Sequence, residues 1–106
     1  MTNQDKIKLY KTLNRGYPED FNRAMDATGD LVDNYFVYLD TEDGINCDKE
    51  LKRLPNADYK LCCVLLTMLL REDHFDNGCF SERYDKGQVL PIVNRMIALL
   101  EDEKRR

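Results

Sequence analysis

Long apolar runs are missing from this sequence, and their absence limits where the protein can reside. A helix that crosses a bilayer needs about 20 consecutive apolar residues, and the most apolar stretch here, residues 61–70, is far shorter. The first residues, MTNQDKIKLYK, also lack the apolar segment of a secretory signal peptide. We therefore expect a cytoplasmic protein without a membrane partner.

Motifs that mark common catalytic and phosphate-binding sites are missing as well. There is no glycine-rich phosphate loop, no G-x-S-x-G nucleophile elbow, no H-E-x-x-H motif and no pair of carboxylates in an apolar setting. The chain has one histidine, His74. We predict no catalytic residue and no cofactor, and we favour a protein that is not an enzyme.

The four cysteines, at positions 47, 62, 63 and 79, lack the spacing of a metal site. Structural zinc usually takes four Cys or His ligands, often in C-x-x-C pairs. Cys62 and Cys63 are adjacent, and neighbours on a helix point about 100° apart. A calcium loop from Asp73 would place Phe75 and Tyr84 where oxygen ligands are needed. We expect no metal, and reduced thiols as is typical of a cytoplasm.

Basic residues are scarce in one part of the chain where acids are frequent. No Lys or Arg lies between Arg23 and Lys49, a stretch that contains Asp26, Asp30 and several further acids, and the net charge is −4. Such a stretch repels phosphates, so we expect no nucleic-acid partner. Two interpretations stay open: a solvated acidic face, or a surface that docks a basic partner.

Apolar side chains at helical spacing are frequent, and they predict an all-α fold. Residues 88–101 have the clearest period. Residues 61–70, LCCVLLTMLL, are apolar on all sides, which is typical of a helix at the centre of a bundle. Further helices are predicted over 3–14, 17–28 and 46–54, with Asn56 as N-cap of the central helix. We predict one compact domain, residues 1–106, with five or six helices and short connections.

The predicted core comes mainly from the two most apolar helices. Its residues are Leu61, Val64, Leu65, Met68, Leu69, Phe75, Val89, Ile92, Val93, Met96, Ile97 and Leu100. Cys62 and Cys63 lie in the same apolar run, and we expect them to act as small buried hydrophobes without a redox role.

Residues 30–39, DLVDNYFVYL, are ambiguous. Leu31, Val32, Tyr35, Phe36 and Leu39 follow a helical pattern, whereas YFVY has high strand propensity. A strand needs a partner strand, and no other convincing strand is present. We therefore predict a helix here.

Residues 71–87, REDHFDNGCFSERYDKG, form the most unusual stretch. Asp76-Asn77-Gly78 is a turn signal. Ser81 is expected to cap a short helix that Gly87 closes. Phe75, Phe80 and Tyr84 are expected to fold back onto the core, so the stretch is interpreted as a connection between two helices.

The same stretch has a chemical alternative. Arg71 could hold an anion, His74 could act as an acid or base, and Cys79 could be a nucleophile, provided that the three side chains converge. This alternative describes a small-ligand (anion) binder or an enzyme that uses residues 71–87.

The function that we favour is a non-catalytic protein-interaction module. Its partner would be another protein or a second copy of the chain. Tyr35, Tyr38 and Tyr84 are the candidate contact residues, because they are aromatic and lie near the acidic stretch.

The C-terminal half also resembles a known family. Its members carry an R-x-x-R-F-x-x-G element followed, after a spacer, by G-x-V-x-x-I/L-L-x-R-L. The residues that carry the resemblance are Arg71, Phe75, Gly78, Gly87, Val89, Ile92 and Arg95. Over residues 71–97 the chain is similar to the bacterial domain-of-unknown-function family DUF6508. The resemblance implies a small helical bacterial protein of no established activity. His74 stands where the family has an arginine, which weakens the catalytic alternative.

Overall fold

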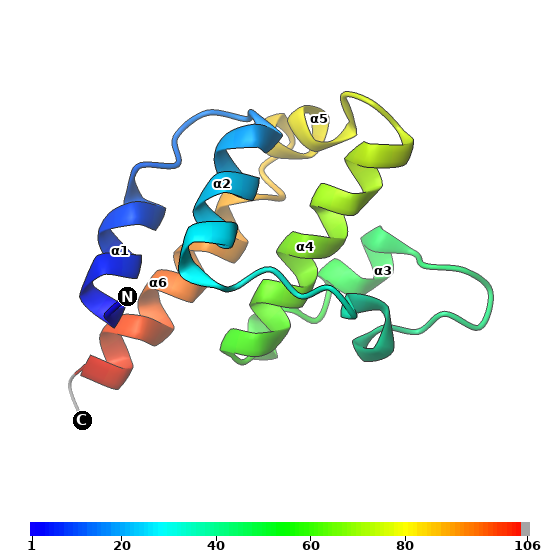
Figure 1. The fold of residues 1–106 in the computed structure, drawn as a ribbon. Helices are drawn as coiled ribbons and strands as arrows, with labels where there is room; N and C mark the ends of the chain where they lie inside the picture. The colour runs from blue at the N-terminus through cyan, green and yellow to red at the C-terminus, as the bar shows by residue number, and fades with distance from the viewer. Residues whose placement is uncertain (105–106) are drawn as a thin grey trace.

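The computed structural model describes residues 1–104, and in that range it contains helices and loops but no strand (Figure 1). The α-helices are α1 (Asn3–Lys11), α2 (Pro18–Thr28), α3 (Cys47–Leu51), α4 (Tyr59–Phe75), α5 (Cys79–Asp85) and α6 (Leu90–Lys104). Two 3-10 helices, η1 (Tyr35–Tyr38) and η2 (Leu54–Asn56), lie between them. The predicted all-α bundle is confirmed. None of the described helices is long and apolar enough to cross a membrane.

Helix α4 is the centre of the fold because it is apolar on every side. All residues from Cys62 to Leu70 are buried, and α4 packs against α2, α3, α5, α6 and η1. Figure 1 shows α1, α2 and α6 on one side of α4, with α3 on the other. Because α4 is covered on both sides, even Thr67 is fully buried, and its hydroxyl accepts a hydrogen bond from the Val32 N–H at 3.3 Å.

Most of the predicted core residues are buried, namely Val64, Leu65, Met68, Leu69, Val89, Ile92, Val93, Met96 and Leu100. Leu61 and Ile97 are partly buried and pack against them. The prediction for Phe75 is wrong, because this side chain is 88% exposed at the end of α4. Phe80 is the fully buried aromatic of this region, and its ring centroid lies 4.9 Å from that of Phe21.

The substitution Leu65→Ala should lower the free energy of unfolding by about 2–5 kcal/mol, because it leaves a cavity in the packed centre. Leu65 is 0% exposed. Urea unfolding followed by circular dichroism measures the change. Leu61→Ala, on the same helix but partly buried, is the control and should cost less. An effect below about 1 kcal/mol for Leu65 would contradict the central position of α4.

Residues 30–39 form neither the predicted α-helix nor the strand that was its alternative. Only Tyr35–Tyr38 is helical, as η1. Contacts with other helices hold the segment instead, since the Val32 N–H donates to Thr67 of α4 and the Asp30 carboxylate accepts from Tyr10 of α1. Aromatic and β-branched residues in YFVY add only weak helix propensity.

Two helix starts differ in detail from the prediction. The N-cap of α4 is Asp58, whose carboxylate accepts the Leu61 N–H at 2.8 Å. Asn56, predicted for this role, is instead the last residue of η2, a separate 3-10 turn that begins at Leu54. Helix α3 begins after Asn46, whose side chain accepts the Lys49 N–H at 3.0 Å.

A buried carboxylate joins α1, α4 and the loop that follows α2. Asp30 accepts hydrogen bonds from the hydroxyls of Tyr10 at 2.5 Å and Tyr59 at 2.6 Å, and from the Lys6 ammonium at 3.0 Å. Burial opposes the charged form, but these three donors hold the pKa of Asp30 below its usual value. Burial and the neighbouring carboxylate raise the pKa of both tyrosines. The Asp30 carboxylate is therefore a charged structural group that fixes the start of the segment 30–39.

Candidate functional site

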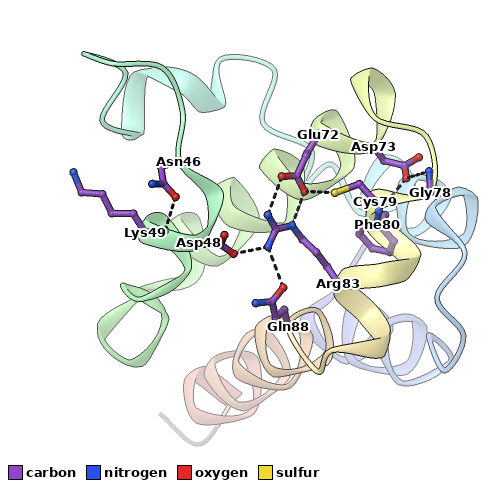
Figure 2. Close-up of polar contacts among 10 residues, drawn as sticks. All are labelled: Asn46, Asp48, Lys49, Glu72, Asp73, Gly78, Cys79, Phe80, Arg83 and Gln88. Atoms are coloured by element: carbon purple, nitrogen blue, oxygen red, sulfur yellow. Dashed lines mark hydrogen bonds and ion pairs between the residues drawn. The ribbon is translucent and has the colours of Figure 1, made fainter.

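The turn between α4 and α5 is built by one aspartate. The carboxylate of Asp73 accepts the N–H groups of Gly78 at 3.1 Å and Phe80 at 3.0 Å (Figure 2). Gly78 is the N-cap residue, with a φ of 93° that favours glycine. The prediction that Ser81 caps α5 is therefore wrong. Its hydroxyl donates instead to the carbonyl of Gly16 at 2.6 Å and fixes α5 to the loop between α1 and α2.

A cluster around Arg83 holds three helices together. Its guanidinium forms two bonds with Glu72, Nε to Oε1 at 2.5 Å and Nη2 to Oε2 at 2.9 Å. Nη1 donates to Asp48 at 2.9 Å and to Gln88 at 3.0 Å. Figure 2 shows Arg83 reaching from α5 toward Glu72 on α4 and Asp48 on α3. With 12% of its side chain exposed, Arg83 fixes the relative positions of these helices.

Two thiols lie close to the Glu72 carboxylate. The Cys79 thiol donates to Oε1 at 3.0 Å, and Cys47 lines the same cavity as Glu72. Arg83 lowers the pKa of Glu72 to about 2. Burial, followed by the adjacent carboxylate, raises the pKa of Cys47 to about 12 and that of Cys79 to about 11. Both thiols are therefore protonated at neutral pH, and protonated thiols are weak nucleophiles.

A cavity of about 260 Å³ lies beside this cluster, between η1, α3 and the C-terminal half of α4. We call it the α4–η1 cavity. The residues that line it are Tyr35, Ile45, Cys47, Met68, Arg71, Glu72, Phe75 and Asp76. Its walls are largely apolar, and its charged groups come from the last turns of α4.

Apolar side chains are exposed around this cavity. Phe75 is 88% exposed, Phe36 50% and Ile45 38%. The rings of Tyr35 and Phe36 are in edge contact, with centroids 5.7 Å apart. We call these four residues, Tyr35, Phe36, Ile45 and Phe75, the η1 surface.

The predicted ligand-binding residues occupy different places. Arg71 lines the α4–η1 cavity, and its nearest ionic partner is Asp33 at 3.9 Å. His74 is exposed, with its ring centroid 6.3 Å from that of Phe75. Cys79 is bonded to Glu72. Among the described residues, no hydrogen bond or ion pair joins any two of Arg71, His74 and Cys79. No group of three or more Cys, His, Asp or Glu side chains in residues 1–104 is arranged to hold a metal ion.

The three tyrosines predicted as contact residues also lie in different parts of the structure. Tyr35 is partly buried and lines the α4–η1 cavity. Tyr38 is 41% exposed, and the Lys60 ammonium lies 5.7 Å from its ring centroid. Tyr84 is partly buried against Phe21 and so close to Gly16 that an added Cβ there would lie 2.9 Å from its ring. Tyr35 is the member of the three that belongs to the cavity.

Sequence reasoning missed Cys47, Glu72 and Arg83. Glu72 lies on α4 and Arg83 on α5, so the spacing within a single helix does not pair them and their contact depends on the turn between the two helices. A signal for the η1 surface was present, because YFVY lies between acidic residues in a stretch without Lys or Arg.

The sequence over residues 6–102 matches the profile of a family of unknown function, DUF6508. No curated protein and no solved structure matches the chain significantly. The match covers nearly the whole chain and agrees with the resemblance seen in its C-terminal half. The chain therefore belongs to the DUF6508 family.

Proposed function

We propose that this protein is a non-catalytic protein-interaction module that docks a partner on the η1 surface. The observation that carries the proposal is the 88% exposure of Phe75 beside a cavity that Tyr35 and Ile45 also line. Contiguous exposed apolar side chains around a hollow are typical of binding surfaces. An apolar surface of the partner would cover Phe75.

The charges around the surface favour a basic partner. Asp76 is exposed at the cavity wall, and the side chain of Asp33 is 97% exposed. The loop that carries Ile45 also contains the exposed Glu42 and Asp43. Positive charges near these carboxylates would speed and orient the encounter. The same charges disfavour nucleic acid as the partner.

The chemistry of the cluster beside the cavity supports a non-catalytic role. Cys47 and Cys79 are held as protonated thiols, and Glu72 is engaged in a two-point ion pair with Arg83. A catalytic nucleophile needs an adjacent base or a lowered pKa, whereas both thiols have the opposite shift. The cluster instead supports the walls of the docking cavity.

A bacterial cytoplasm is the setting we propose for this activity. All four cysteines are free thiols, and the burial of Cys62 and Cys63 in the core suits a reducing compartment. Family membership brings no activity of its own, so the docking surface is the basis of the proposal.

Selection of random displayed peptides on the immobilised protein tests the proposal. We expect enriched peptides that combine an aromatic or large aliphatic residue with Lys or Arg, because the cavity is apolar and its surroundings are acidic. Titration of a labelled winning peptide should give an affinity that Phe75→Ser or Tyr35→Ala lowers at least about tenfold, the loss expected for one buried apolar anchor.

The matched control is Tyr17→Ser, which removes another exposed aromatic (53% exposed) outside the η1 surface. It should leave peptide affinity unchanged. Enrichment of acidic peptides, or winners whose affinity is insensitive to Phe75 and Tyr35, would overturn the proposal.

A further inference from the structure

A second hollow lies on another part of the molecule, between α1 and α2. Its volume is about 390 Å³. Its lining combines apolar residues, among them Leu9, Leu13 and Ala24, with the charged residues Arg15, Asp20 and Arg23. We call it the α1–α2 groove. Its small alanine and apolar leucines leave room for a large side chain.

The rim of the groove carries an excess of positive charge. Arg15 and Arg23 share one carboxylate, that of Asp20, at 3.3 Å and 3.9 Å. Both arginine side chains are mostly exposed, at 63% and 78%. The Arg15 guanidinium also lies 4.8 Å from the centre of the Tyr17 ring, which holds it near the groove. One of the two positive charges is thus free for an acidic occupant.

The η1 surface presents the chemistry that this groove would recognise. Phe75 is an exposed aromatic side chain, the next residue is the exposed Asp76, and the exposed Asp33 lies 3.9 Å from Arg71, which lines the cavity. An aromatic anchor with carboxylates around it matches an apolar groove with arginines on its rim. The groove also carries the positive charge that we expect of the partner at the η1 surface.

From this complementarity we infer that the partner at the η1 surface is a second copy of this chain. Phe75 of one copy enters the α1–α2 groove of the other, and Asp76 meets Arg15 or Arg23. This inference rests on the proposed function, because it names the partner of the same surface.

The two surfaces belong to different sides of the fold. In Figure 1 helices α1 and α2, whose residues line the groove, lie at the left, whereas the C-terminal end of α4 lies at the upper right. The contact therefore joins different patches on two copies. One side chain and one or two ion pairs make a small interface, so we expect weak association, with a dissociation constant on the order of 100 μM at low salt.

Sedimentation velocity over a wide range of protein concentration tests the inference. The wild-type chain should associate as concentration rises, and less so at high salt because the ion pairs are screened. Phe75→Ser should stay monomeric because it lacks the anchor. The double variant Arg15→Glu/Arg23→Glu should also stay monomeric because it lacks the groove charge.

Mixing the two variants gives the decisive result. Phe75→Ser still has a groove and Arg15→Glu/Arg23→Glu still has Phe75, so the mixture should form a one-to-one complex that neither forms alone. Lys52→Glu/Lys86→Glu is the matched control, since it reverses two exposed lysines outside both surfaces and should associate like the wild type.

Three outcomes would overturn the inference: a wild-type chain that is monomeric throughout, association that the groove variant leaves intact, or a mixture that stays monomeric. None of these outcomes bears on the proposed function, which the peptide selection tests separately. A peptide that binds at Phe75 while the chain stays monomeric keeps the docking surface and excludes the second copy. Peptides insensitive to Phe75 would instead count against the docking surface itself.

Discussion

Replacement of Asp30 by alanine is expected to lower the free energy of unfolding by about 3–5 kcal/mol, the largest effect that we predict for a single polar side chain. The carboxylate is 8% exposed and accepts bonds from Tyr10, Tyr59 and Lys6. Its removal leaves the Lys6 ammonium and the Tyr59 hydroxyl without this acceptor. A buried donor that loses its partner costs its full desolvation energy.

Urea unfolding of Asp30→Ala and of the control Asp26→Ala measures the effect. Asp26 is an exposed acid on α2, four residues earlier, and its replacement should change the unfolding free energy by less than about 0.5 kcal/mol. A double-mutant cycle with Tyr10→Phe should show coupling of about 1 kcal/mol or more. Equal, small effects at positions 26 and 30 would show that the network does not stabilise the fold.

Arg83→Ala is expected to cost about 2–4 kcal/mol, because it leaves the Glu72 carboxylate without its cation in a partly buried position. Glu72 is 22% exposed and Arg83 12% exposed. Arg71→Ala is the control: its ion pair with Asp33 is long and exposed, and such pairs contribute about 0–1 kcal/mol. Urea unfolding at neutral pH compares the two variants.

The pH dependence of the unfolding free energy distinguishes the ion pair from simple packing. The pKa of Glu72 falls from 4.5 to about 2 on folding, so the unfolded chain binds more protons between these values. The stability that Glu72 contributes is therefore present above about pH 5 and lost as the pH falls toward 2. Arg83→Ala should flatten this acid dependence by roughly 1–2 kcal/mol, after allowance for solvent screening. If the unfolding free energy of Arg83→Ala depended on pH as steeply as that of the wild type, the ion pair would be excluded as the cause of the acid dependence.

The sequence was informative wherever local spacing decides the structure. The helical period of α6 and the apolar run of α4, in which only Thr67 is polar, show which faces must be buried. Both helices and most of the core residues could therefore be predicted from the sequence. Pro18 and Gly29 likewise marked the two ends of α2. These features depend on residues within one or two helical turns of each other.

The errors came from contacts between distant residues. Residues 30–39 had a helical pattern, but Asp30 and Val32 are bound by side chains of α1 and α4. Phe75 is a large apolar residue and was expected in the core. The hydrogen bonds that Asp73 accepts from Gly78 and Phe80 instead fix a turn that places Phe80 in the core. Exposure of an aromatic side chain cannot be derived from its own neighbours in sequence, so the docking surface required the structure.

The packing of α1 against α6 has a consequence for synthesis of the protein on the ribosome. Helices α1 and α6 are in contact, and the Asn3 side chain donates to Glu103 at 3.1 Å. Because α1 is translated before α6, the part of α1 that packs against α6 stays uncovered in the nascent chain until α6 has been translated. The same proximity would let a short linker join the two ends in a circular permutant with its new termini in the loop at residues 40–46.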